Sequence, residues 1–298
     1  MPTVTLVTSR DVLANPDEAD PELGLVQRSL ARRGVTCDLV NWRTASDLSG
    51  SDLVVIKSPW DYTRRVAEFV AWLDAVEGQT CVLNPPEMIR WNLDKSYLAE
   101  LAEGGVAVCS TVYCRTMDEV QAAVAAEHGR VVVKPTVSAS SDHTGLFEPD
   151  DPAALDLARQ ILELGKDVMV QPALESIGRV GERSLIHFDG RFVHAAARSP
   201  LLALGGGLLG SSRGRIRSVQ PDPDERELAD CALAVAGEVL AARGVDEPAL
   251  HARVDLARDG HGRPVLSELE LFEPSFFLEL APGAERLYAD AILARLEA

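Results

Sequence analysis

The most informative segment of the chain reads Leu250-His-Ala-Arg-Val-Asp-Leu-Ala-Arg-Asp-Gly-His-Gly-Arg-Pro-Val-Leu-Ser-Glu-Leu-Glu-Leu-Phe-Glu-Pro-Ser275. Apolar and polar residues alternate over 249–257 and again over 264–271. Turn-forming residues, Asp259-Gly260 and Gly262, lie between these two stretches. Alternation on both sides of a glycine-containing turn predicts a β-hairpin.

This hairpin carries three carboxylates. Asp255 is on the first strand, while Glu268 and Glu270 are two positions apart on the second and share a face, which also holds Arg253. Acids gathered on one face repel each other unless a cation lies among them, and oxygen ligands without His or Cys suit Mg²⁺. We therefore expect a magnesium site that carries the phosphates of a nucleotide. The alternative is an exposed amphipathic hairpin neutralised by Arg253.

Composition narrows the class of protein. The 298 residues are 46% hydrophobic and 25% charged, which is enough for two or three compact lobes. A net charge of −17 argues against nucleic acid or an anionic membrane as partner, and no apolar run is long enough to span a membrane. The five cysteines lack metal-ligand spacing, and Met1-Pro-Thr leads into an apolar strand rather than a signal peptide. We expect a reduced, cytoplasmic protein.

Strand and helix patterns alternate at the amino-terminal end, which predicts a parallel sheet with helices on its faces, an α/β arrangement. The strands are expected over 4–7, 37–42, 53–56 and 81–84, with helices over 21–33 and 63–77.

Two loops of this sheet follow the carboxyl ends of strands, where ligands bind in such folds. From them we expect the substrate contacts Ser9, Arg10, Ser58, Trp60, Asp61 and Tyr62. Asp61 would pair with an ammonium group and Arg10 with a carboxylate. The alternative for the second loop is a packed connection in which Trp60 belongs to the core.

The middle of the chain contains three segments that suggest nucleotide binding. A strand over 130–135 contains Lys134 and leads into a loop over 136–145 whose small hydroxyl residues, Ser140 and Ser141 among them, form an anion cradle. Asp189-Gly190 predicts a hairpin between strands 182–188 and 191–198. The glycine-rich segment 204–215 is interpreted as a lid. The remaining elements are helices over 96–103, 117–127, 152–164, 223–243 and 282–296, a strand over 167–171, and an extended segment over 106–113.

In this order, the parts resemble the ATP-grasp superfamily of carboxylate–amine ligases, particularly its glutathione-synthetase-like and ribosomal-modification-ligase-like members. The resemblance covers roughly residues 84–298. It implies an α+β ATP-grasp fold behind an amino-terminal substrate domain. The expected divisions are 1–90 for the substrate domain, 91–170 for a first lobe with phosphate-binding lysines, and 171–298 for a second lobe with the lid and the metal-binding hairpin.

The resemblance also implies roles for individual residues. Lys95 and Lys134 look like the phosphate-binding lysines, and Glu182 looks like the ribose-binding acid. Arg198 stands where these enzymes hold a cation against the terminal phosphate. The hinge that meets adenine corresponds to Gln171, Pro172, Ala173, Leu174 and Glu175.

Arg253-Val-Asp255 and Glu268-Leu-Glu270 resemble the metal triad of the superfamily, which implies ATP and two Mg²⁺ ions as cofactors. Glu270 stands where the third metal ligand is often asparagine, so the site carries one more negative charge than usual. Arg253 and Arg198 are the expected catalytic residues, with Arg253 stabilising an oxyanion.

Three phrases, 57–62, 84–95 and 273–278, resemble a bacterial group of stand-alone ligases that includes the O-ureido-serine cyclo-ligase of cycloserine biosynthesis. This implies an ADP-forming ligase that activates a small amino-acid carboxylate as an acylphosphate for attack by an amine nitrogen. Ser275 is an expected substrate contact. The alternatives are an intermolecular amino-acid ligase and a non-catalytic nucleotide-binding scaffold. A homodimer is also expected.

Overall fold

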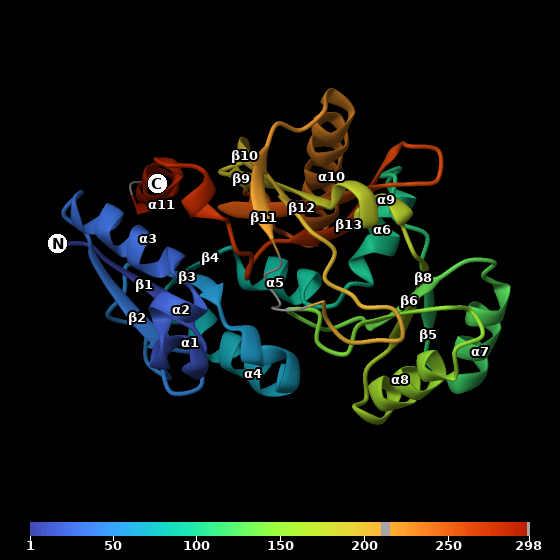
Figure 1. Ribbon diagram of the computed structural model, residues 1–298. Coiled ribbons are helices and arrows are strands. Elements are labelled where there is room, and N and C mark those ends of the chain that lie inside the picture. The colour runs from blue at the N-terminus through green and yellow to red at the C-terminus, as the bar shows by residue number, and fades with distance from the viewer. Residues whose placement is uncertain (210–214, 297–298) are drawn as a thin grey trace.

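A computed structural model describes residues 1–209 and 215–296 of the chain. Three separate sheets follow one another across the molecule, with the amino-terminal sheet at the left of Figure 1. The part of the predicted lid from Gly210 to Gly214 lies outside the described residues.

The first sheet has the strand order β2-β1-β3-β4, and every neighbouring pair is parallel, as predicted. Its strands are β1 (Thr3–Thr8), β2 (Thr36–Asn41), β3 (Leu53–Ser58) and β4 (Cys81–Leu83). Leu53 and Val55 of β3 pack with α3 (Glu22–Ala31), whereas Val54 and Ile56 pack with α4 (Val66–Glu77). Because both faces of β3 are covered, its sequence is an uninterrupted apolar run rather than an alternating one.

Short helices replace the two loops expected after β1 and β3. They are α1 (Arg10–Ala14), α2 (Pro16–Ala19) and the 3-10 helix η1 (Trp60–Arg64). Ser9 caps α1 by accepting a hydrogen bond from the backbone N–H of Val12. The hydroxyl thus satisfies a free helix-end donor, which is a common reason for serine at this position.

The second sheet, β5-β8-β6-β7, is antiparallel. Its strands are β5 (Val112–Cys114), β6 (Val131–Pro135), β7 (Gly145–Phe147) and β8 (Val168–Pro172). The helices α7 (Met117–Ala126) and α8 (Pro152–Glu163) pack against it. α7 begins at a capping box between Thr116 and Glu119, which is a local signal for the start of a helix.

The third sheet, β11-β10-β9-β12-β13, is antiparallel and contains both predicted hairpins. Its strands are β9 (Glu182–Phe188), β10 (Arg191–Arg198), β11 (Ile216–Val219), β12 (His251–Arg258) and β13 (Pro264–Glu270). Asp189 and Gly190 both have positive φ, 49° and 72°, as the tight turn between β9 and β10 requires. The long helix α10 (Pro223–Ala241) packs on one face of the sheet.

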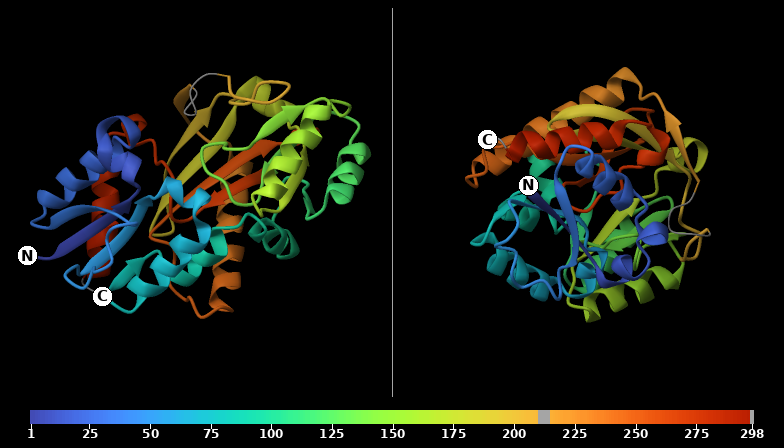
Figure 2. Two further views of the ribbon diagram at one scale, coloured as in Figure 1. Left: turned by 90° about the horizontal axis from the view of Figure 1, so that it is seen from below. Right: turned by 90° about the vertical axis from the view of Figure 1, so that its left-hand side faces the viewer.

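The remaining helices join the sheets. They are α5 (Pro86–Asn92), α6 (Tyr97–Glu103), α9 (Glu175–Val180), the 3-10 helix η2 (Leu278–Leu280) and α11 (Ala284–Leu296). Although α11 ends the part predicted as the second lobe, it packs against α3, and Figure 2 shows it beside the amino-terminal sheet. None of the helices in the described part of the chain combines the length and apolar character needed to cross a bilayer.

Candidate active site

A cavity of about 540 Å³ is lined by residues from the segments around all three sheets. It brings together most of the side chains that the sequence singled out. These are Trp60, Lys95, Lys134, Ser140, Ser141, Gln171, Pro172, Leu174, Glu182, Arg198, Arg253, Glu268, Glu270 and Ser275.

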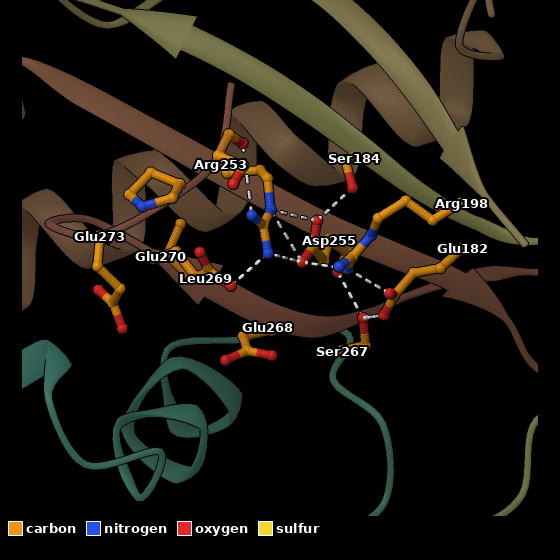
Figure 3. Close-up of polar contacts among 12 residues, drawn as sticks. Glu182, Ser184, Arg198, Arg253, Asp255, Ser267, Glu268, Leu269, Glu270 and Glu273 are labelled. Atoms are coloured by element: carbon orange, nitrogen blue, oxygen red, sulfur yellow. Dashed lines mark hydrogen bonds and ion pairs between the residues drawn. The ribbon is translucent and has the colours of Figure 1, made fainter. Parts of the chain in front are cut away.

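Three carboxylates meet on the β12–β13 hairpin (Figure 3). The register pairs Asp255 with Glu268 and Arg253 with Glu270. One ligand atom from each of Asp255, Glu268 and Glu270 lies within 4.8 Å of the others. A bulge at Ser267 follows, and the Ser267 hydroxyl donates hydrogen bonds to Glu182 and to the Asp255 carbonyl, which joins the two hairpins. The side chains predicted to share one face do so.

Two arginines neutralise these acids. Arg253 bonds both oxygens of Asp255 and also Glu270, and Arg198 bridges Asp255, at 2.7 Å, and Glu182. The salt bridge of the alternative interpretation is therefore present. The exposed hairpin of that interpretation is not, since Arg253 is 5% exposed and Asp255 is completely buried. Buried charges of this kind mark a site rather than a solvated surface.

The pKa values of the three carboxylates are shifted in different directions. Burial alone would raise the pKa of Asp255, but the charges of Arg198 and Arg253 hold it below its usual range. Lys95 and Lys134 likewise lower the pKa of Glu268 against the effect of burial. Burial raises the pKa of Glu270 to about 7, and the neighbouring acids add to this rise. A divalent cation would favour the ionised form of all three.

Lys95 and Lys134 line the same cavity as Glu268 and Glu270 of the triad. The Lys95 Nζ lies 3.2 Å from Glu268 Oε1 and donates to the Ser138 carbonyl at 2.8 Å. Ser140 and Ser141 line the cavity and have a left-handed backbone, with φ of 53° and 58°. Such a conformation turns backbone N–H groups into an anion-binding concavity.

The predicted hinge runs from β8 into α9. Gln171 donates to the Thr111 hydroxyl at 2.7 Å, and Pro172 and Leu174 form the wall of the cavity together with Val132 and Ile177. Ala173 and Glu175 do not line it. The backbone N–H of Ala173 is used by the Arg130 carbonyl, and the Glu175 side chain is exposed at the start of α9.

The predicted substrate contacts differ in which cavity they line. Trp60 and Ser275 line the first cavity, and a second cavity of about 820 Å³ is lined by Ser9, Asp61 and again Trp60. The Asp61 carboxylate accepts a hydrogen bond from the Trp42 indole at 2.6 Å. Arg10 is exposed and lines neither cavity.

Ser58 and Tyr62 are both buried and line neither cavity, so their part in substrate binding stays a prediction. The Ser58 hydroxyl bonds Thr8 on the neighbouring strand, and the Tyr62 hydroxyl donates to Glu273. Ser58 is the last residue of β3, and Tyr62 lies in η1, where the chain turns back into the core.

Sequence reasoning missed Asp20, Glu22 and Glu273, which also line the first cavity. Asp20 and Glu22 form ion pairs with the completely buried Lys57, at 3.4 and 2.9 Å. The sequence contained a signal for Glu273, because this residue follows Glu270 by three positions in the same carboxylate-rich segment. The other two had none, because their segment resembles an ordinary helix start.

Comparisons with known proteins show the family to which the chain belongs. The family described as "D-cycloserine synthetase DcsG, N-terminal domain" matches residues 4–84. The cycloserine biosynthesis protein DcsG of Streptomyces lavendulae is 34% identical over 273 residues, which cover 89% of this chain and 90% of that protein. The chain belongs to the D-cycloserine synthetase family of ATP-grasp ligases. The crystal structure of D-cycloserine synthetase DcsG superimposes with a TM-score of 0.90 at 32% identity, over 99% of both chains.

More distant structures share the fold of the D-cycloserine synthetase family. An ATP-grasp RimK domain protein from Sphaerobacter thermophilus has a TM-score of 0.70 at 19% identity, over 97% of this chain and 98% of that one. The D-alanine–D-alanine ligase of Bacillus anthracis, solved with ATP, has 0.69 at 13%, over 99% and 97%. The ATP-grasp fold prediction is confirmed. As a family member, this protein is an ATP-dependent ligase that forms a C–N bond.

Proposed function

We propose that the protein is an O-ureido-D-serine cyclo-ligase of antibiotic biosynthesis, which joins the carboxylate of its substrate to a nitrogen of the same molecule. The observation that carries this proposal is the similarity to a protein named D-cycloserine synthetase over almost the whole chain, including the amino-terminal part. A scaffold without chemistry has no reason to keep two lysines, two arginines and three carboxylates around one cavity.

The residues present fit magnesium. Asp255, Glu268 and Glu270 offer oxygen atoms only, and their close approach matches the needs of a hard divalent cation. We propose that they hold two Mg²⁺ ions, which would neutralise charge on the nucleotide phosphates. With the metal balancing the acids, Arg253 and Arg198 would be able to direct part of their N–H groups toward the reacting groups.

The nucleotide would lie along the first cavity. Pro172, Leu174, Val132 and Ile177 form an apolar wall suited to the adenine ring, and Gln171 adds a polar side chain. Glu182, whose pKa burial raises, would accept hydrogen bonds from the ribose hydroxyls. The remaining phosphate contacts would come from Lys95, Lys134, Ser140 and Ser141.

The chemistry follows from the poor reactivity of a carboxylate toward nitrogen. Transfer of the terminal phosphoryl group of ATP to the substrate carboxylate gives an acylphosphate and ADP. The nitrogen then forms a bond to the acyl carbon and releases its proton, and phosphate leaves with the C–O bonding pair. Arg198 would hold the transferred phosphoryl group, and Arg253 would stabilise the oxyanion of the tetrahedral intermediate.

Water must be kept from the acylphosphate, because it hydrolyses. Segment 201–209 contacts the second sheet, where Gly205 and Gly206 donate backbone hydrogen bonds to the carbonyl of Leu146 in β7. Leu201 and Leu202 of this segment line the cavity. We propose that it closes over bound substrates as the described part of a lid.

An intermolecular ligase is the second candidate. It is favoured by the second cavity, which shares Trp60, Ser140 and Ser141 with the first and so offers space for a separate amine. A homodimer in the cytoplasm also stays a prediction, and light scattering would measure the mass of the particle.

Phosphate release from Mg-ATP tests the proposal. The panel would contain O-ureido-D-serine, its L-isomer and D-serine, each with and without a separate amine. We expect release with O-ureido-D-serine alone, and a cyclic product by mass spectrometry. Glu268→Gln should lower the rate about a hundredfold or more, because a metal ligand is lost. Release only when a separate amine is present would establish the intermolecular ligase instead.

A further inference from the structure

Almost every buried or partly buried carboxylate that lines the first cavity has a cation beside it. The pairs are Asp20 and Glu22 with Lys57, Glu182 with Arg198, Glu268 with Lys95, and Glu270 with Arg253. Glu273 differs. It is 8% exposed, and it has no ion pair with any lysine or arginine in the described part of the chain.

The carboxylate of Glu273 is held from one side. Its Oε1 accepts a hydrogen bond from the Tyr62 hydroxyl at 2.9 Å, and its backbone carbonyl accepts one from the Trp60 indole at 2.9 Å. Its Oε2 has no hydrogen-bond partner among the described residues. Figure 3 shows the carboxylate apart from the network of Arg253 and Asp255. One oxygen is thus anchored and the other is left for a ligand.

A buried carboxylate without a compensating partner is unfavourable. Burial raises the pKa of Glu273 to about 8, and the charge of Glu270 adds to this rise. The group of proposed magnesium ligands does not include Glu273, so a bound Mg²⁺ would not offset the unfavourable burial of this carboxylate. Trp60 lines the same cavity, and an indole ring also favours a nearby cation.

We propose that Glu273 binds the ammonium group of the amino-acid substrate, in a subsite that Trp60 helps to form. This inference rests on the proposed function, since it requires a substrate with an α-amino group. In such a substrate, the ammonium and the carboxylate are attached to the same carbon. Glu273 lines the same cavity as Glu268 and Glu270, so an ammonium held there keeps the substrate carboxylate within this cavity.

Calorimetry with the full chain, Mg²⁺ and a non-hydrolysable ATP analogue tests this. The two probes are O-ureido-D-serine and the same molecule with hydrogen in place of the α-amino group. The wild type should bind the amino compound about tenfold tighter or more, as a charge-assisted contact predicts. In Glu273→Gln this preference should fall to about twofold or less, with unchanged affinity for the ATP analogue.

Glu279→Gln is the matched control, because Glu279 lines the same cavity but is exposed, and it should keep the wild-type preference. Glu273→Asp keeps the charge and should retain part of the preference, which covers the case in which the glutamine variant does not fold. A full preference in Glu273→Gln would overturn the inference. Tight binding by the wild type, together with no phosphate release in the separate assay with Mg-ATP, would overturn the cyclo-ligase alone. No binding of either probe would overturn both.

Discussion

At the scale of single residues, Gly181 determines how closely the two ends of the β9–β10 hairpin approach. Its φ is 80°, and a Cβ added there would lie 2.3 Å from the Arg198 carbonyl oxygen. Glu182, the next residue, forms its ion pair with Arg198 across this approach. Only glycine combines the left-handed backbone with the missing side chain, so Gly181 helps to build the nucleotide site.

Gly181→Ala should therefore lower the free energy of unfolding by about 2–4 kcal/mol, from backbone strain together with a steric clash. Gly190→Ala is the matched control. Its φ is 72° but nothing lies within 4 Å of an added Cβ, so it should cost about 1 kcal/mol from strain alone. Urea denaturation of both variants measures the difference. Equal losses would show that the close approach to Arg198 does not matter.

At the scale of elements, segment 273–277 is held by strand β3 and helix α3 of the amino-terminal part rather than by its own hairpin. Lys57 Nζ donates to the Pro274 carbonyl at 2.9 Å. Glu22 accepts from the backbone N–H groups of Phe276 and Phe277, at 2.8 and 2.6 Å. The first domain thus positions Glu273 and Ser275 at the cavity as well as contributing Trp60.

Lys57→Met should destabilise the protein by about 3–5 kcal/mol, because it leaves Asp20 and Glu22 buried without their cation. Arg64→Met removes an exposed ion pair with Asp142 and should cost less than about 1 kcal/mol. Chemical denaturation monitored by tryptophan fluorescence would compare the two. A loss below that of Arg64→Met would mean that the buried network does not hold the turn.

At the scale of the whole molecule, the cavity lies where three sheets meet, so its ligands connect parts of the chain that are far apart in sequence. Anything that binds the folded state alone stabilises it by mass action. An ATP analogue at a hundred times its Kd should add about 2.7 kcal/mol to the free energy of unfolding.

That stabilisation should depend on the metal. With EDTA in place of Mg²⁺, the rise in melting temperature should largely disappear, because the phosphates would face Asp255, Glu268 and Glu270 without a cation between them. Glu268→Gln should show a reduced rise even with Mg²⁺. An equal rise with EDTA and with Mg²⁺ would argue that the carboxylates do not hold a metal.

Local sequence patterns were sufficient to predict most of the helices and strands. The alternation around Gly262 predicted the hairpin that carries Asp255, and Asp189-Gly190 predicted the other hairpin, because strand period and turn chemistry depend on neighbouring residues only. The same holds for α7, whose capping box is a local device. The short helices after β1 and β3 were missed, since they form only a turn or two and lack an apolar period.

The sequence by itself determined the strands, the hairpins and the face shared by the three hairpin carboxylates, because these follow from the backbone period. Only the tertiary structure decided what surrounds each side chain. Tyr62 and Glu273 are far apart in the chain, yet the first is packed in the core and anchors the second at the cavity. Lys57, which a sequence pattern places in a recognition loop, is completely buried between two acids. Periodicity tells which residues share a face, but burial and charge partners depend on which distant segment covers that face.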